Sequence, residues 1–159
     1  MEALADDFPP FDDRCILPGG KEVLFLKKTQ IAVAELYQRR ADSHWQFTYG
    51  DIESFTVACD NVLPCVLRSL GILEISSELE RKMEARESMP VGTEEAQLRA
   101  AAVAATEMIL QSGNGAFWSK ELNDYLCPLV RNQQLRQIER HATIGTFFSG
   151  DSAGSPTSG

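Results

Sequence analysis

The sequence has few cysteines and few histidines, and their spacing is not that of a metal site. Four cysteines occur singly among 159 residues, and only two histidines are present. The sequence contains no CxxC pair and no Cys/His spacing typical of zinc binding. We therefore expect no metal ion, and we interpret the cysteines as reduced thiols, mostly packed inside an intracellular, cytoplasmic protein.

Long apolar runs and phosphate-binding glycine motifs are also missing. No stretch of about 18 uninterrupted apolar residues is present to span a membrane. The first residues, 1–7, are acidic and lack the basic and then apolar pattern of a signal peptide. Gly19-Gly20 is too short for a phosphate loop or a dinucleotide fingerprint. We expect a soluble protein without membrane association or a nucleotide cofactor.

Basic residues are outnumbered by acidic ones. The chain has 15 Lys and Arg against 23 Asp and Glu, a net charge of -8. Proteins that bind long nucleic acid normally use a basic face for most of their affinity, so this class is disfavoured. A nucleotide-sized ligand needs only a local pocket and remains compatible with the charge. With 43% hydrophobic residues, the chain is suited to one compact domain.

The hydrophobic pattern predicts an all-α fold, an orthogonal helical bundle. We expect an extended segment over 1–20 that ends in a turn at 18–20, a helical domain over 21–148 and a disordered tail over 149–159. Caps and apolar spacing predict helices over these ranges: 21 to about 40, 51 to near 60, 64–70, 76–88, 93–112, 119–127 and 132–141. Thr93 is expected to cap its helix, and Pro128 to stop another. A short strand is allowed only between Thr143 and Phe148.

Asp60 stands between two of these helices, at the bend of a predicted helix-hairpin-helix. Pro64 fits the first turn of the second helix, and Gly71 fits its left-handed end. The carboxylate has two interpretations. It caps the following helix, which is the commoner role of such an aspartate, or it is a catalytic group in a cleft.

Two lysines and a histidine have weaker claims to a functional role. Lys27 and Lys28 interrupt the apolar face of the first long helix. We expect their stems to cover the core while the ammonium groups reach water, with a catalytic role as the alternative. His44 has no second ligand or carboxylate at a suitable spacing, so we interpret it as a surface histidine.

Several separated motifs follow one another along the chain. They are Phe8-Pro-Pro-Phe-Asp-Asp13, Val23-Leu-Phe-Leu-Lys-Lys-Thr-Gln-Ile31, Thr56-Val-Ala-Cys-Asp60, Leu63-Pro-Cys-Val-Leu-Arg-Ser-Leu-Gly-Ile-Leu73, Gly92-Thr-Glu-Glu-Ala-Gln-Leu-Arg99 with Glu107, and more weakly Leu122-Asn-Asp-Tyr-Leu126 and Arg140-His-Ala-Thr-Ile-Gly-Thr-Phe-Phe148. In this order they resemble the queuosine 5′-phosphate N-glycosylase/hydrolase family, also called queuosine salvage proteins. The resemblance covers nearly the whole chain except its ends, and it corresponds to about the carboxy-terminal half of a full-length member.

The resemblance implies both a fold and a reaction. Family members have a helical fold similar to helix-hairpin-helix DNA glycosylases, and they hydrolyse the N-glycosidic bond of queuosine 5′-phosphate. The released queuine is reinserted into transfer RNA. The implied partner is therefore a small nucleotide, and no cofactor is expected because water is the second substrate.

The resemblance also assigns residues. Asp60 falls on the catalytic aspartate of the family. Ala58 replaces the phenylalanine that contacts the base, Asn123 replaces a ligand-binding aspartate, and Cys127 replaces a tryptophan. His141 matches a histidine of the terminal motif. Asp60 is thus the expected catalytic residue, and Ala58, Asn123 and His141 are expected at the ligand.

The replaced ligand positions leave two functions open. The first is a divergent or truncated hydrolase that acts on queuosine 5′-phosphate. The alternative is a non-catalytic helical binding module derived from the family, or a fragment that needs a separate amino-terminal half to complete its pocket.

Overall fold

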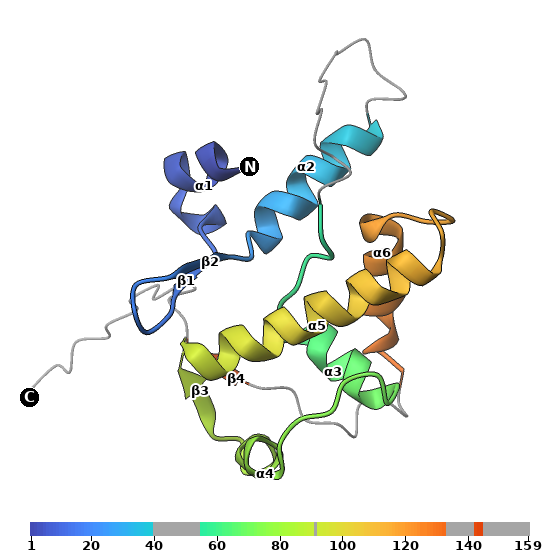
Figure 1. Cartoon of the computed structure of the whole chain (residues 1–159). Coiled ribbons are helices and arrows are strands. Elements are labelled where there is room, and N and C mark those ends of the chain that lie inside the picture. Colours follow the sequence, from blue (N-terminus) through green and yellow to red (C-terminus); the bar gives the residue numbers. More distant parts are fainter. Residues whose placement is uncertain (40–54, 91, 133–141, 145–159) are drawn as a thin grey trace, which may run out of the picture.

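The computed structural model describes residues 1–39, 55–90, 92–132 and 142–144, and the chain is mainly helical (Figure 1). In chain order its elements are α1 (Glu2–Asp7), the 3-10 helix η1 (Pro9–Phe11), β1 (Arg14–Ile16), β2 (Glu22–Leu24), α2 (Lys27–Arg39), α3 (Val62–Ser69), α4 (Ser77–Glu84), β3 (Ser88–Pro90), α5 (Thr93–Ser112), α6 (Ser119–Leu129) and β4 (Ala142–Ile144). The mainly helical class is therefore confirmed. The similarity to helix-hairpin-helix DNA glycosylases stays a prediction.

A β-hairpin at residues 14–24 corrects the prediction for the amino-terminal part. β1 pairs antiparallel with β2. The predicted turn joins them: Gly19 and Gly20 have φ angles of 92° and 79°, a region that glycine enters without a Cβ clash. Because β2 belongs to this sheet, α2 begins at Lys27, later than predicted. The segment 1–20 is not extended throughout either, since α1 and η1 are helical.

Smaller corrections concern the later elements. β3 and β4 form a parallel pair, and β4 overlaps the short strand allowed at 143–148. Gly92, not Thr93, is the N-cap of α5, without a side-chain cap bond. Pro128 does not stop α6, which includes the proline and continues to Leu129. The predicted helix at 132–141 lies almost entirely outside the described residues, and the tail and both histidines lie wholly outside them.

Two predicted helix ends are confirmed by their hydrogen bonds. Gly71 follows α3 with a φ of 70°, and the N–H of Ile72 donates to the carbonyl of Leu67 over 2.9 Å. This is the 6→1 bond of a Schellman motif, which satisfies carbonyls that the helix leaves open. At the start of α4, the Ser76 hydroxyl accepts a hydrogen bond from the N–H of Leu79 over 3.2 Å.

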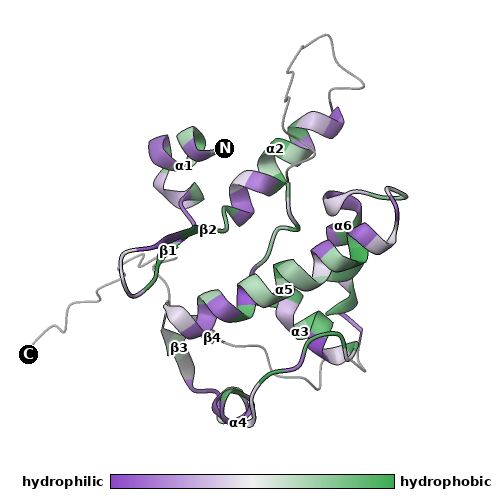
Figure 2. Cartoon of the chain, in the orientation of Figure 1, coloured by the Kyte–Doolittle hydropathy of each residue, from purple (hydrophilic) through white to green (hydrophobic). Residues whose placement is uncertain are grey.

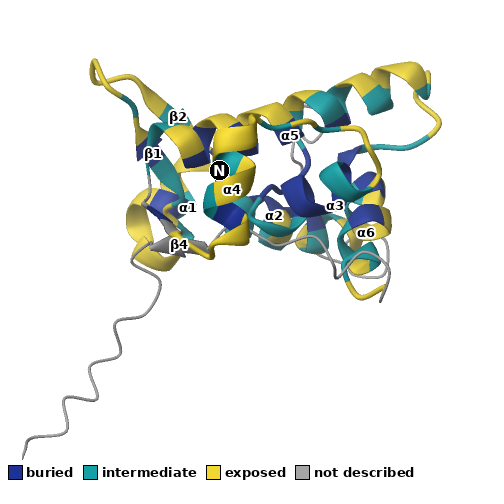
Figure 3. Cartoon of the chain, turned by 90° about the horizontal axis from the view of Figure 1, so that it is seen from below, coloured by how far each residue is buried: buried dark blue, intermediate teal, exposed yellow. Residues whose placement is uncertain are grey.

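The main hydrophobic core lies between α3, α5 and α6. Leu63 and Leu67 of α3 have no exposed surface, and they cluster with Ala102 of α5 and Leu126 of α6. Full burial of one leucine contributes about 1.5–3 kcal/mol. Figure 2 shows α3 and the middle of α5 as largely hydrophobic and α4 as largely hydrophilic, and Figure 3 shows that α5 keeps an exposed outer side. The core therefore fixes α3 and α6 against the inner side of α5.

Arg99 of α5 makes a buried set of polar contacts beside this core. Its guanidinium pairs with both carboxylate oxygens of Asp13, over 2.8 and 2.6 Å. It donates to the Cys59 carbonyl over 2.7 Å, pairs with Glu95 over 3.3 Å, and lies 3.9 Å from the ring centre of Phe25. Arg99 thus joins the amino-terminal hairpin, α5 and the segment before Asp60.

Asp13, which Arg99 holds in place, also contacts the start of α2. Its Oδ2 accepts a hydrogen bond from the N–H of Lys27 over 3.2 Å, and its carbonyl accepts from Phe25 and Leu26 over 3.0 and 3.2 Å. The first contact satisfies an open N–H group at the start of α2. The others hold Leu26 at a φ of 47°, a conformation that costs a non-glycine residue about 1–2 kcal/mol.

Replacing Arg99 by methionine should destabilise the protein strongly. Arg99→Met keeps much of the side-chain volume but leaves Asp13 and Glu95 as buried charges without their cation, which costs about 3–5 kcal/mol. Urea denaturation followed by circular dichroism measures the free energy of unfolding. Arg81→Met is the control, since Arg81 is 67% exposed and should change stability by about 0.5 kcal/mol or less. Equal losses in both variants would contradict the role given to Arg99.

Candidate functional site

Asp60 lies at the end of an extended segment, which contradicts the predicted helix-hairpin-helix. Residues 55–59 contain no helix, and α3 begins only at Val62. Val57 and Cys59 are buried, with 0% and 1% of their surface exposed. The Cys59 carbonyl is held by Arg99, so this backbone is bound to another element instead of to its own helix. Figure 1 shows the segment passing from the region of α2 to the start of α3.

The Asp60 carboxylate accepts a hydrogen bond at the start of α3 and also forms an ion pair. Its Oδ1 accepts from the N–H of Val62, the first residue of α3, over 2.8 Å. The N-cap of α3 is Asn61 and makes no side-chain cap bond, so Asp60 satisfies this open N–H from the residue before the N-cap. Its Oδ2 pairs with the ammonium group of Lys27. Both side chains are 29% exposed, so one side of the pair faces solvent. The Lys27 ammonium therefore has a carboxylate partner, which the sequence did not predict, as well as contact with solvent.

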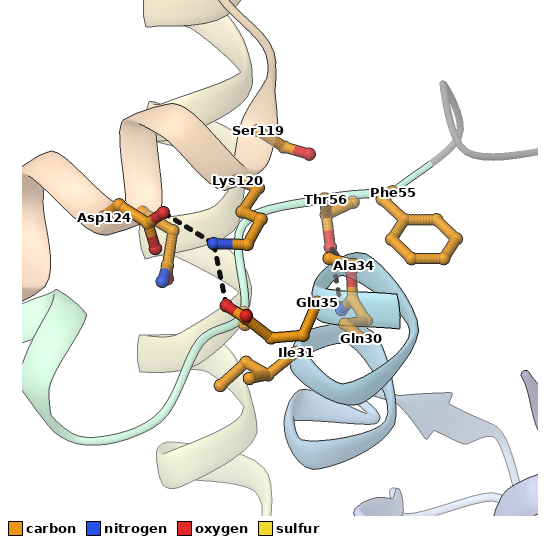
Figure 4. A pocket seen from close by; sticks show the side chains of 11 residues that line it. Gln30, Ile31, Ala34, Glu35, Phe55, Thr56, Ser119, Lys120 and Asp124 are labelled. Carbon is orange, nitrogen blue, oxygen red and sulfur yellow. Dashed lines mark hydrogen bonds and ion pairs between the residues drawn. The ribbon is translucent and has the colours of Figure 1, made fainter. Parts of the chain in front are cut away.

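A cavity of about 220 Å³ lies between α2, α6 and residues 55–58 (Figure 4). Ala58 and Asn123, two of the residues predicted at the ligand, both line it. Asp60 follows Ala58 by two residues but does not line the cavity. The structure therefore brings three of the four predicted site residues to one region, while His141 lies outside the described residues.

One wall of the cavity carries three charged side chains that the sequence did not indicate as a site. The Lys120 ammonium lies 3.0 Å from a Glu35 oxygen of α2 and 2.6 Å from an Asp124 oxygen of α6. Burial lowers the pKa of Lys120, but hydrogen bonds to Asp124 and Glu35 outweigh it, and the pKa is raised. The i,i+4 spacing of Lys120 and Asp124 was an available signal. Nothing local pointed to Glu35.

Cys127 lies on α6 one turn after Asn123, a residue that lines the cavity. Its thiol donates a hydrogen bond to Asn123 Oδ1 over 3.4 Å. Burial raises the pKa of the thiol to about 11; the Asp60 carboxylate adds to this rise and the Lys27 ammonium opposes it. A thiol with this pKa stays protonated at neutral pH and is a poor nucleophile.

The four cysteines are free, as predicted, and three of them are buried. Within residues 1–39, 55–90, 92–132 and 142–144, no group of three or more His, Cys, Asp or Glu side chains is placed to hold a metal ion. None of the helices in these same ranges has the length and apolar character needed to cross a bilayer.

Comparison with known proteins identifies the family. The family model for queuosine salvage proteins matches residues 1–143. The chain belongs to the queuosine salvage protein family. This confirms the resemblance carried by the ordered motifs.

Three relatives carry the name queuosine 5′-phosphate N-glycosylase/hydrolase. The protein from Sphaerobacter thermophilus is 33% identical over 104 residues, that from Schizosaccharomyces pombe 31% over 115, and that from Mus musculus 30% over 110. These alignments cover 65%, 72% and 69% of this chain, but 32%, 33% and 32% of the relatives. The matched part is therefore about a third of the length of each relative.

The raised pKa of Cys127 predicts a thiol that resists alkylation. Iodoacetamide reacts with the thiolate, so Cys127 should stay unmodified in the folded protein at about pH 8. Mass spectrometry after digestion measures the modified fraction, and the same reaction in urea, where all four thiols are accessible, is the control. Modification of Cys127 as fast in the folded as in the unfolded protein would contradict this pKa.

Proposed function

We propose that this protein hydrolyses the N-glycosidic bond of queuosine 5′-phosphate and releases queuine for transfer RNA modification. One observation carries the proposal: Ala58 and Asn123 line the same cavity, and the partly exposed Asp60 carboxylate follows Ala58 by two residues. All three are positions that the family resemblance assigns to the substrate. The names of the relatives support the same reaction.

The proposed role of Asp60 is electrostatic. Breaking the bond between C1′ and the base leaves positive charge on the ribose ring, and a carboxylate next to the ring stabilises this charge or orients the attacking water. The water oxygen bonds to C1′ as the base departs with the electron pair of the broken bond. The base takes up a proton, so the products are queuine and ribose 5-phosphate.

Lys27 and the start of α3 would hold the carboxylate in place for this step. Lys27 pairs with one oxygen of Asp60, and the N–H of Val62 donates to the other. With both oxygens held, the carboxylate has one orientation and loses little freedom when the sugar binds. The backbone N–H of Lys27 is itself fixed by Asp13, so the same polar network supports both members of the pair.

The cavity would take the base. About 220 Å³ is below the roughly 300–1,000 Å³ of pockets for whole drug-sized ligands, so it suits the base more than the complete nucleotide. Ala58 leaves room where the family has phenylalanine, and the Asn123 amide offers a donor and an acceptor. In this arrangement the sugar faces Asp60, and His141 stays a predicted ligand contact.

The second candidate is a non-catalytic binding module, or a domain that needs a separate chain to complete its pocket. Two observations favour it: the matched stretch is about a third of each relative, and the family phenylalanine and aspartate are Ala58 and Asn123 here. This candidate predicts no queuine release by the isolated protein. The hydrolase predicts release that depends on Asp60.

Replacing Asp60 by asparagine should abolish most of the activity. Asp60→Asn keeps the size and an acceptor for Val62 but removes the negative charge, and loss of one such electrostatic group costs about 10²–10³ in kcat. Chromatography of queuine released from queuosine 5′-phosphate measures the rate. Asp7→Asn, on the exposed side of α1, is the control and should keep the wild-type rate. Unchanged activity in Asp60→Asn would reject the role of this residue.

Restoring the family carboxylate at position 123 should strengthen ligand binding. Queuine carries a cationic secondary amine, and a charge-assisted contact contributes about 1–3 kcal/mol. Asn123→Asp should therefore lower the Kd of queuine by about 5- to 100-fold, as measured by calorimetry. Asn114→Asp, in the exposed connection after α5, adds the same charge away from the cavity and should leave the Kd unchanged. A weaker or unchanged Kd in Asn123→Asp would contradict the place given to the base.

A further inference from the structure

The wall of the cavity already binds an ammonium group, which the chain itself supplies. Figure 4 shows the Lys120 side chain reaching between Asp124 and Glu35, with both contacts drawn. The ammonium lies 2.6 Å from Asp124 and 3.0 Å from Glu35. Both carboxylates line the cavity, and so does Lys120. The two acids come from different helices, α6 and α2, so the tertiary fold creates this arrangement.

The burial of the three side chains differs in a way that leaves the acids open to a ligand. Lys120 is only 11% exposed, whereas Glu35 is 46% and Asp124 55% exposed. Each carboxylate has more lone pairs than one ammonium group uses. Two negative charges also share one positive charge, so the group keeps a net negative charge on the cavity wall. A second cation, or one that displaces Lys120, is therefore favoured there.

A similar group elsewhere in the chain shows that the cavity makes the difference. Lys82 also lies between two carboxylates, 3.6 Å from Glu78 and 2.9 Å from Glu94. None of these three residues lines the cavity. The charges alone thus do not define a site. Glu35, Asp124 and Lys120 differ because they line a cavity. Asn123, a position that the resemblance assigns to the ligand, lines the same cavity.

We infer that Glu35 and Asp124 form the subsite for the cationic amine of the ligand, and that Lys120 occupies this subsite while the cavity is empty. The inference rests on the proposed function and specifies the chemical class of the ligand: a base that carries an alkylammonium arm. Asp124 adjoins Asn123, where the family carboxylate is missing. The negative charge needed by the amine is supplied by these two neighbouring acids.

Lys120 makes this subsite selective. Without a cation, the two partly buried carboxylates would repel each other, so Lys120 holds them together in the empty cavity. A ligand with its own ammonium group replaces this contact, whereas a neutral base gains nothing from the acids. Lys120 therefore competes with the ligand amine, and it lowers the affinity for every cationic base while leaving the affinity for a neutral base unchanged.

Calorimetry with two bases tests the inference. Queuine carries the cationic arm, and 7-deazaguanine is the same ring system without it. Lys120→Met should lower the Kd of queuine by about fivefold or more, and Glu35→Gln should raise it by about fivefold or more. Neither should change the Kd of 7-deazaguanine by more than about twofold. Lys82→Met and Glu94→Gln are matched controls that should leave both Kd values unchanged.

The outcomes separate this inference from the proposed function. Equal effects on both bases, or weaker queuine binding by Lys120→Met, would overturn the amine subsite while leaving hydrolysis to the Asp60 test. Failure of every protein to bind queuine would also overturn the amine subsite, whereas the release of queuine from queuosine 5′-phosphate decides the proposed function separately. Lys120→Arg keeps the competing charge and should bind queuine like the wild type. If circular dichroism shows that Lys120→Met does not fold, the Kd values of Glu35→Gln and Lys120→Arg for queuine decide whether the amine subsite exists.

Discussion

The contact on which the site depends is the buried pair between Arg99 and Asp13. A guanidinium with 7% of its residue surface exposed must have its charge and its donors satisfied, because an unpaired buried charge costs several kcal/mol. Asp13, Glu95 and the Cys59 carbonyl supply these partners. Only 4% of the Glu95 surface is exposed, and this burial raises the pKa of its carboxyl even beside Arg99. Three distant segments are thereby held in one arrangement.

This arrangement determines where the functional groups lie. Arg99 fixes the backbone just before Asp60, and Asp13 fixes the first N–H of α2. Lys27 and Asp60, 33 residues apart, meet as a consequence. The core under α3 then places α6 beside them, and the cavity forms between α6 and α2. The site therefore combines side chains from three segments, and the contacts that hold each segment in place lie outside the site.

Charge compensation also shapes the ligand region. The resemblance places Asn123 where the family has an aspartate, and the cavity wall at Asn123 holds two carboxylates around Lys120. In the proposed subsite, Glu35 and Asp124 bind the cationic amine in place of a carboxylate at position 123. A cavity in which Asn123 replaces the aspartate can therefore still favour a cationic ligand, as long as the fold keeps these two acids on its wall.

The sequence by itself determined the features that depend on neighbouring residues: the mainly helical class and the Gly71 and Ser76 helix ends. The ordered motifs also predicted Asp60, Ala58 and Asn123 as site residues. The tertiary structure alone decided that residues 55–59 are extended and that Lys27 pairs with Asp60. It also decided that Glu35 and Lys120 share one wall of the cavity. Local patterns report backbone preference and one-sided burial, whereas these contacts join residues far apart in the chain, where only the folded core brings opposite charges together.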